Sequence, residues 1–299
     1  MYEEYFGLRE KPFSLLPDPS FLFLTEKHRR ALTLLEYGLT SQSGFTVVTG
    51  EIGSGKTTLV RKLLQADDPE VTIGLINNTQ CTSIDELLRW VAFAFNLSYK
   101  GQHQVELYDV FTDFLVREYG SGRRVVLIID EAQQLGLELL EQVRMLSNIN
   151  ADKHQVVQFI LVGQPNLRTF LRRPELAQFA QRIVVDYHLE PLDELETDAY
   201  IKHRLTVSGA STELFTAPAT TIIWRQSRGI PRLINILCDT ALVYAFSDQR
   251  RQVDEELVLE VVKDKATGLA PVGESRPAPR DDRSDLVERT HMIEKLFGN

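Results

Sequence analysis

Hydrophobic residues follow two different spacings along this chain. Short, continuous apolar runs that are rich in β-branched residues indicate strands buried on both faces of a parallel sheet. Longer segments in which apolar residues recur every three or four positions indicate amphipathic helices. We expect strands at 45–48, 71–76, 125–129, 156–162 and 183–187, and helices at 25–40, from 56 onward, and at 83–96, 104–119, 193–207, 216–226, 231–247 and 254–265.

A glycine-rich segment joins the first strand to the helix that follows it. Its residues fit the pattern G-x-x-x-x-G-K-[ST] at Gly50, Gly55, Lys56 and Thr57. In such a loop the backbone N–H groups turn inward around a phosphate chain, the lysine reaches the β- and γ-phosphates, and the hydroxyl ligates Mg²⁺. We therefore predict a site for ATP and Mg²⁺, with the nucleotide bound by Gly50, Glu51, Ile52, Gly53, Ser54, Gly55, Lys56, Thr57 and Thr58.

Two carboxylates, Asp130 and Glu131, follow the apolar run at 125–129. Because ligands of a parallel sheet bind beyond the carboxyl ends of its strands, both should face the same crevice as Lys56. There Asp130 can hold Mg²⁺ through water, and Glu131 can polarise the water that attacks the γ-phosphate. Gln164, which follows the fourth strand, should reach the same edge, where its amide can read the γ-phosphate or orient that water.

The first 24 residues combine six aromatic side chains with three prolines. The prolines argue against a helix, and the aromatic residues argue against a disordered tail, so the segment should pack on the rest of the protein. Two interpretations stay open: a strap that closes the core, and a segment that covers the adenine of the nucleotide.

At the C-terminal end, proline and mixed charge from Gly268 predict a linker, and later apolar residues allow a short helix that either frays or docks a partner.

Composition narrows the classes of protein that this chain can represent. A net charge of −9 argues against a protein whose main role is to coat nucleic acid. No apolar run approaches the ~20 residues that cross a bilayer, and the N-terminus lacks the regions of a signal peptide, so we expect a cytoplasmic protein without a transmembrane segment. Cys81 and Cys238 are far apart in the sequence and are expected to be free thiols.

Five segments accompany the glycine-rich loop at 50–57, here called the phosphate loop: Pro12-Phe13-Ser14, Pro17-Asp18-Pro19, Asp130-Glu131-Ala132-Gln133, Leu161-Val162-Gly163-Gln164-Pro165 and Gly229-Ile230-Pro231-Arg232. In this order they resemble the AAA+ ATPases, and more narrowly the general secretion pathway protein A family with its relatives in exosortase and polysaccharide-export systems. The resemblance implies a P-loop NTPase: an αβα sandwich with a five-stranded parallel sheet at 44–190, preceded by the strap and a helix at 1–43 and followed by an all-helical lid at 191–267 and a flexible tail at 268–299.

The resemblance also implies roles for polar residues outside the phosphate loop. By position, Gln164 is the residue that senses the γ-phosphate, and Arg232 is the lid arginine that contacts the nucleotide. Arg182 is the arginine finger offered to the γ-phosphate of a neighbouring subunit, and Arg172 and Arg173 compete with it for that role. The implied assembly is a homo-oligomer, a ring or a filament, with nucleotide between subunits.

Three functions are compatible with this sequence. The first is a Mg²⁺-dependent ATPase that drives or regulates the assembly of an envelope secretion or polysaccharide-export machine, at the inner face of the membrane. The second is a DNA-binding regulatory ATPase of the transposition or origin-recognition type, which the acidic composition disfavours. The third, a nucleotide-gated scaffold without turnover, is disfavoured by the presence of Glu131. Members of the secretion family continue into a membrane span and a peptidoglycan-binding domain, whereas this sequence ends in a short polar tail, so anchoring to the cell wall is not expected.

Overall fold

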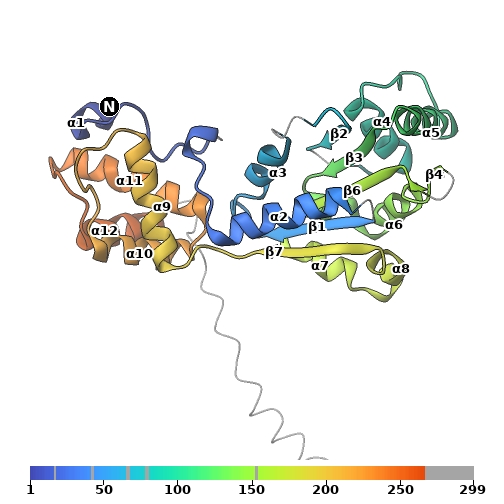
Figure 1. Cartoon of the computed structure of the whole chain (residues 1–299). Helices are drawn as coiled ribbons and strands as arrows, with labels where there is room; N and C mark the ends of the chain where they lie inside the picture. The colour runs from blue at the N-terminus through green and yellow to red at the C-terminus, as the bar shows by residue number, and fades with distance from the viewer. Residues whose placement is uncertain (17, 42–43, 65–67, 78–80, 152–153, 267–299) are drawn as a thin grey trace, which may run out of the picture.

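The computed structural model describes residues 1–266, apart from 17, 42–43, 65–67, 78–80 and 152–153; the predicted tail at 268–299 lies outside the described residues. Figure 1 shows a core built around a sheet and, beside it, a lid of helices. In chain order the elements are α1 (Tyr2–Phe6), η1 (Pro19–Phe21), α2 (Glu26–Thr40), β1 (Phe45–Gly50), α3 (Lys56–Leu64), β2 (Val71–Ile76), α4 (Ile84–Ala94), α5 (Gln104–Gly120), β3 (Arg124–Ile129), η2 (Ala132–Leu135), α6 (Gly136–Leu146), β4 (Asn150–Ala151), β5 (His154–Gln155), β6 (Val157–Gly163), α7 (Pro165–Leu171), η3 (Pro174–Leu176), α8 (Ala177–Ala180), β7 (Ile183–Leu189), α9 (Glu194–Val207), α10 (Ala217–Ser227), α11 (Pro231–Ser247) and α12 (Glu255–Ala266).

The five long strands form one parallel sheet in the order β2-β3-β6-β1-β7, which confirms the predicted fold class. β2 follows the phosphate loop in the sequence but lies at the far edge of the sheet, so the acidic strand β3 is not the next strand along the chain. β3, β6 and β1 are consecutive in the sheet. The two carboxylates, Gln164 and the phosphate loop follow these three strands and therefore meet at one edge.

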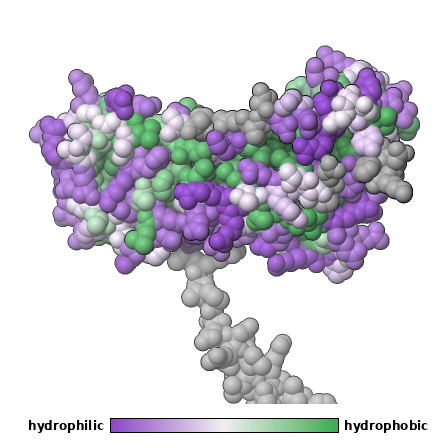
Figure 2. Space-filling view, in the orientation of Figure 1, coloured by the Kyte–Doolittle hydropathy of each residue, from purple (hydrophilic) through white to green (hydrophobic). Residues whose placement is uncertain are grey.

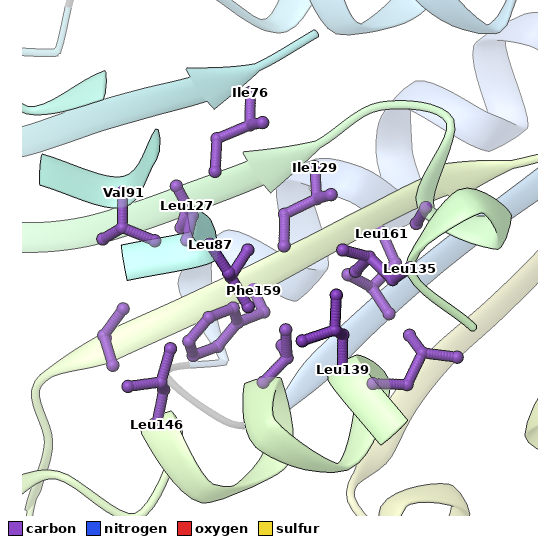
Figure 3. Close-up of a cluster of buried hydrophobic side chains, with 14 of the residues drawn as sticks. Ile76, Leu87, Val91, Leu127, Ile129, Leu135, Leu139, Leu146, Phe159 and Leu161 are labelled. Atoms are coloured by element: carbon purple, nitrogen blue, oxygen red, sulfur yellow. The ribbon is translucent and has the colours of Figure 1, made fainter. Parts of the chain in front are cut away.

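Helices cover both faces of the sheet, which explains why its strands have continuous apolar sequences. On one face, Leu127 and Ile129 of β3 and Phe159 of β6 pack against α4 and α6, as Figure 3 shows. On the other face, α2 and α3 pack against alternate residues of the same strands, among them Ile128 and Ile160. A slip of one residue would exchange the two faces, so this packing fixes the register of the strands.

The lid consists of α9 to α12 around a hydrophobic cluster of its own. The link from β7 to α9 docks on the start of α11, where the backbone N–H of Leu192 donates to the carbonyl oxygen of Gly229 at 2.9 Å. A Cβ on Gly229 would lie 1.9 Å from the carbonyl oxygen of Leu192, and its φ is +69°, so only glycine fits there. This contact explains the glycine before Ile230-Pro231-Arg232 and fixes where α11 begins.

The first residues of the chain pack with the lid. Tyr2, Phe6 and Phe13 are buried in the same cluster as α9 and α11. The prediction that 1–24 contains no helix is wrong for α1, because these five residues precede the first proline and Gly7 ends the helix in the left-handed conformation. The N-terminal segment is thus a strap that closes the hydrophobic cluster of the lid.

The sequence pattern predicted no helix or strand in 132–155 or 165–180, but the described residues of both segments contain several such elements. Most of the missed elements, such as β4, β5 and η3, span only two to seven residues and are too short for a hydrophobic period to show. The exception is α6, whose buried residues recur at helical spacing and could have been predicted: Leu139, Leu140, Val143 and Leu146.

Candidate nucleotide site

The phosphate loop lies at the carboxyl end of β1 and leads into α3. Gly53 and Gly55 have φ values of +82° and +100°, in the region that favours glycine. Gly50 is needed for a different reason, since a Cβ there would lie 2.8 Å from the Oγ of Ser54 and 2.9 Å from the carbonyl oxygen of Leu189. The loop therefore forms a backbone cradle that side chains would fill, as phosphate binding requires.

Lys56 projects from the start of α3 into this cradle and is only 5% exposed. Its Nζ donates to the carbonyl oxygens of Gly50 and Glu51, both at 2.9 Å. Burial lowers the pKa of Lys56, and the nearby carboxylates of Glu131 and Asp130 act in the opposite direction. The ammonium thus lies on the carbonyls of its own loop, where a phosphate chain would offer it stronger, charged acceptors.

Thr57 and Asp130 are joined across the crevice. The Oγ1 of Thr57 donates to one carboxylate oxygen of Asp130 at 2.9 Å, and the other oxygen accepts the backbone N–H of Glu131 at 2.9 Å. Burial raises the pKa of Asp130, while both hydrogen bonds act to lower it. A hydroxyl and a carboxylate in this arrangement are the hard oxygen ligands that Mg²⁺ takes.

The residues present fit ATP and Mg²⁺. Among the described residues, the buried Oγ of Ser54 has no hydrogen-bond partner, and it lies within the cradle. The adjoining Lys56 supplies positive charge, and the Thr57–Asp130 pair supplies oxygen ligands beside it. A phosphate chain would give the Ser54 hydroxyl an acceptor, and Lys56 and the Thr57–Asp130 pair would exchange their present partners for phosphate and Mg²⁺.

Glu131 occupies the turn between β3 and η2, with a left-handed φ of 53°. Its Oε2 accepts the side-chain amide of Gln133 at 2.6 Å and that of Gln164 at 3.1 Å. The Oε1 of Gln133 in turn accepts the backbone N–H of Gln164 at 3.0 Å. The structure therefore brings Gln164 to the acidic pair, at the edge where the sequence placed it.

Arg232 reaches the phosphate loop from the lid. Its backbone N–H donates to the carbonyl oxygen of Gly53 at 3.3 Å, and a Cβ on Gly53 would lie 2.4 Å from the Cβ of Arg232. The arginine side chain is exposed and lines the same cavity as Lys56. Lid and loop are thus in backbone contact at this point.

A cavity of about 470 Å³ extends from the phosphate loop into the space between the lid and the strap. Figure 2 shows that the outline of the molecule dips between the lid and the core. Strap residues at 14–16 and 21–23 line this cavity together with Glu131 and Arg232. The strap thus borders the space where a nucleotide base would lie, and its role in covering adenine stays a prediction.

Arg182 lies at the amino-terminal ends of the strands, whereas the phosphate loop lies at their carboxyl ends. It precedes β7, its carbonyl oxygen accepts the backbone N–H of Phe45 at the start of β1, and its Nη1 donates to the Oγ of Ser147 at 2.8 Å. The competing residues Arg172 and Arg173 are exposed after α7. The phosphate loop of the same chain lies beyond the other ends of these strands, so Arg182 is not placed at the nucleotide site of its own chain.

Two residues at the site were missed as functional candidates. His28 of α2 is buried, its Nδ1 lies 2.8 Å from the Oγ1 of Thr25, and a Cβ on Gly55 would lie 3.3 Å from its Nε2. A single histidine in a helix gives no signal in the sequence. Gln133 was visible within the Asp-Glu-Ala-Gln segment, but no role followed from its position alone.

A buried arginine links the cavity to the strap. Arg204 of α9 donates to the hydroxyl of Tyr200 at 2.9 Å and to the carbonyl oxygens of Pro12 and Ser14 in the strap. The Tyr200 hydroxyl donates to Asn235 of α11 at 2.9 Å. Arg204 lies within an ordinary helical pattern, so only the folded chain shows this connection.

Comparison with known proteins gives this geometry a context. Residues 39–171 match the family described as AAA domain. General secretion pathway protein A from Aeromonas hydrophila is 44% identical over 248 residues, which is 83% of this chain and 45% of that protein. The ATP-dependent target DNA activator B of Escherichia phage Mu is 28% identical over 145 residues, 48% of this chain and 42% of that protein. The chain therefore spans less than half the length of these relatives.

Solved structures show the same fold at low sequence identity. The ORC2 protein of Aeropyrum pernix superposes with a TM-score of 0.64 at 17% identity, over 85% of this chain and 71% of that one. Cdc6p from Pyrobaculum aerophilum gives a TM-score of 0.65 at 17% identity, over 83% and 71%. In the part of the chain that the structure describes, none of the helices has the length and hydrophobicity needed to cross a membrane. The phosphate loop and the acidic strand thus lie within an AAA domain at residues 39–171, and over 83% of its length the chain is similar to general secretion pathway protein A.

Proposed function

We propose that this protein is a Mg²⁺-dependent ATPase. The observation that carries the proposal is the convergence of Lys56, the Thr57–Asp130 pair and Glu131 at one edge of the sheet. Bound Mg²⁺ would neutralise charge on the β- and γ-phosphates. Thr57 and Asp130 hold that ion, Lys56 binds the phosphates, and Glu131 orients the attacking water and accepts its proton.

The remaining site residues act around this centre. Gln164 reads the γ-phosphate, and Arg232 carries the lid onto the nucleotide. Arg182 reaches the γ-phosphate of a neighbouring subunit in a homo-oligomer, a ring or a filament. Arg182 lies at the amino-terminal ends of the strands, away from the phosphate loop of its own chain, and this position supports an action between subunits.

The base of the nucleotide lies between the strap and the lid. The cavity lining supports this placement, because Phe21 and Phe23 of the strap border it together with Tyr200 of the lid. Phe23 and Tyr200 are already in edge contact, with ring centroids 5.8 Å apart. Aromatic and apolar residues around a few polar groups are typical of sites for flat, uncharged bases.

The proposal also includes the cellular process that the protein serves. The similarity of this chain to general secretion pathway protein A supports an ATPase that drives or regulates an envelope secretion or export machine. Such a protein would work in the cytoplasm, at the inner face of the membrane, and its partners would be components of that machine.

The test separates nucleotide binding from hydrolysis. Lys56→Ala should weaken ATP binding, whereas Glu131→Gln should bind ATP normally and lose nearly all turnover. Binding is measured with a fluorescent ATP analogue and turnover by phosphate release, with Lys100→Ala and Glu138→Gln, both exposed, as matched controls. An equal loss of ATP affinity in both site variants would refute the assignment of roles.

A DNA-binding regulatory ATPase is the second candidate, supported by the match to the phage activator. Non-specific DNA binding arises from phosphate neutralisation and weakens steeply with salt. We expect duplex DNA to bind weakly at about 50 mM salt and hardly at about 200 mM, with ATP present. Tight binding at the higher concentration, together with stimulated ATP hydrolysis, would favour this second function instead.

A further inference from the structure

We infer that Gln133 is a positioning residue for hydrolysis: it holds the Glu131 carboxylate in place, so that Gln164 is available to the γ-phosphate. The inference rests on the proposed function of this site. It concerns two amides that contact the same carboxylate oxygen but are anchored in different ways.

The side chain of Gln133 is held at both ends. Its Nε2 donates to Glu131 at 2.6 Å, and its Oε1 accepts the backbone N–H of Gln164 at 3.0 Å. It is 8% exposed, and a Cβ on Gly163 would lie 2.8 Å from its Oε1. The end of β6 is therefore shaped around this amide, which ties the acidic strand to the neighbouring strand.

The side chain of Gln164 contacts Glu131 more loosely. Its Nε2 donates at 3.1 Å, and the residue is half-buried at the edge of the crevice. The Gln164 amide carries two N–H donors on one nitrogen, so directing one at a γ-phosphate reorients the other relative to Glu131. The amide of Gln133, by contrast, is engaged at both ends, by Glu131 and by the backbone N–H of Gln164. When Gln164 turns to a phosphate, the hydrogen bond from Gln133 still holds Glu131.

The backbone of Glu131 makes such a support necessary. A non-glycine residue with φ of 53° is strained, and strain of this kind persists only where neighbouring contacts impose it. Glu131 stands at a turn between a strand and a 3-10 helix, where a side chain without support could take several rotamers. The hydrogen bond from Gln133 selects one of them before substrate arrives.

Gln133→Leu removes the amide at nearly constant size, and Gln133→Glu keeps the acceptor for Gln164 while replacing the donor to Glu131. Both variants should lower kcat about 10- to 100-fold, as the loss of supporting hydrogen bonds does in other sites, with the Kd for a fluorescent ATP analogue within about twofold of wild type. Gln134→Leu is the matched control, because this neighbouring glutamine is exposed and its loss should change neither quantity.

A double-mutant cycle shows whether Gln133 acts through Glu131. In a Glu131→Gln background, Gln133→Leu should cause no further loss of single-turnover rate, because residues that act as a unit are not additive. A further loss there, or a Kd that weakens as much as kcat falls, would show a structural role and overturn the inference.

Two results distinguish this inference from the proposed function. If Glu131→Gln is inactive and Gln133→Leu retains the wild-type kcat, only the inference is overturned. If Glu131→Gln itself retains turnover, the proposed role of Glu131 fails, and the role of Gln133 fails with it.

Discussion

The core and the lid bring residues to the nucleotide site by different means. In the core, the site residues follow β1, β3 and β6, three neighbouring strands whose parallel register brings their ends together. In the lid, Arg232 reaches the loop only because Gly229 docks on Leu192 and Arg232 itself packs on Gly53. The order of the strands alone brings the core residues of the site together. The position of Arg232 depends instead on tertiary contacts at Gly229 and Gly53, which an added side chain at either glycine would disrupt.

The N-terminal residues connect these two regions. The strap is buried in the lid cluster, and α2, which follows it, packs on the sheet. Lys27 of α2 donates to Glu196 and to the carbonyl oxygen of Pro191, both at 2.9 Å, so the start of the lid is also held by the core side. The cavity lies where the chain crosses between the two regions, and changes on either side should have distinct effects.

The largest expected effect comes from Arg182, which precedes β7 in the core. Arg182→Ala should bind ATP but lose ~10³- to 10⁵-fold in turnover, because an arginine supplied by a neighbour stabilises charge on the transferring phosphoryl group. An Arg182→Ala subunit keeps its own Lys56 and Glu131, and a Glu131→Gln subunit keeps its Arg182. Mixing the two inactive variants under conditions of subunit exchange should therefore restore measurable ATPase activity.

Parallel mixtures identify the finger. Arg172→Ala and Arg173→Ala should hydrolyse ATP normally, since Arg182 is the proposed finger. If one of them is inactive and complements Glu131→Gln while Arg182→Ala does not, the finger is that residue. If none complements although exchange is demonstrated, hydrolysis does not depend on an arginine from a neighbour.

The next effect tests the connection between strap and lid. Arg204→Met should lower the free energy of unfolding by about 2–3 kcal/mol, because it removes the donor to the buried carbonyl oxygen of Pro12 and to the partly buried one of Ser14. Arg168→Met is the control; its ion pair with Asp186 is partly exposed, and its loss should cost within about 1 kcal/mol. Urea unfolding measures both, and equal costs would mean that Arg204 contributes no more than a surface pair.

The difference between the core and the lid also determined which features could be predicted from the sequence. The strands, the phosphate loop and the acidic pair were predictable because local patterns encode them, and sheet order then brings them together. The Arg204 contact joins residues 192 positions apart in the chain, and no local pattern indicates such a pair. Gln133 is an intermediate case, since it lies in a recognisable segment but acquires a partner only through the turn at Glu131.

A smaller effect tests the contact between the lid and the phosphate loop. Gly53→Ala places a Cβ 2.4 Å from the Cβ of Arg232, in addition to straining a backbone with φ of +82°. Gly101→Ala imposes a similar strain, with φ of +75°, but meets nothing within 4 Å. We expect Gly53→Ala to weaken ATP binding about tenfold, equivalent to about 1.4 kcal/mol, and Gly101→Ala to leave ATP binding unchanged. Equal affinities in the two variants would show that the lid contact does not matter for binding.

The smallest effect is a pH dependence that originates beside the loop. Burial lowers the pKa of His28, and a backbone hydrogen bond with Ser54 acts in the opposite direction. An unfolded histidine has a pKa near ~6.5. As the pH decreases below that value, the unfolded chain binds more protons than the folded one, and the free energy of unfolding decreases.

The free energy of unfolding, measured in urea at about pH 7.5, 6.5 and 5.5 around that value, should decrease less steeply with decreasing pH in His28→Gln than in wild type. Because burial also lowers the pKa of His203 in the lid, part of the slope should remain and should shrink further in the variant that also carries His203→Gln. An unchanged slope in His28→Gln would mean that this histidine is not kept neutral by the packing between α2 and the loop.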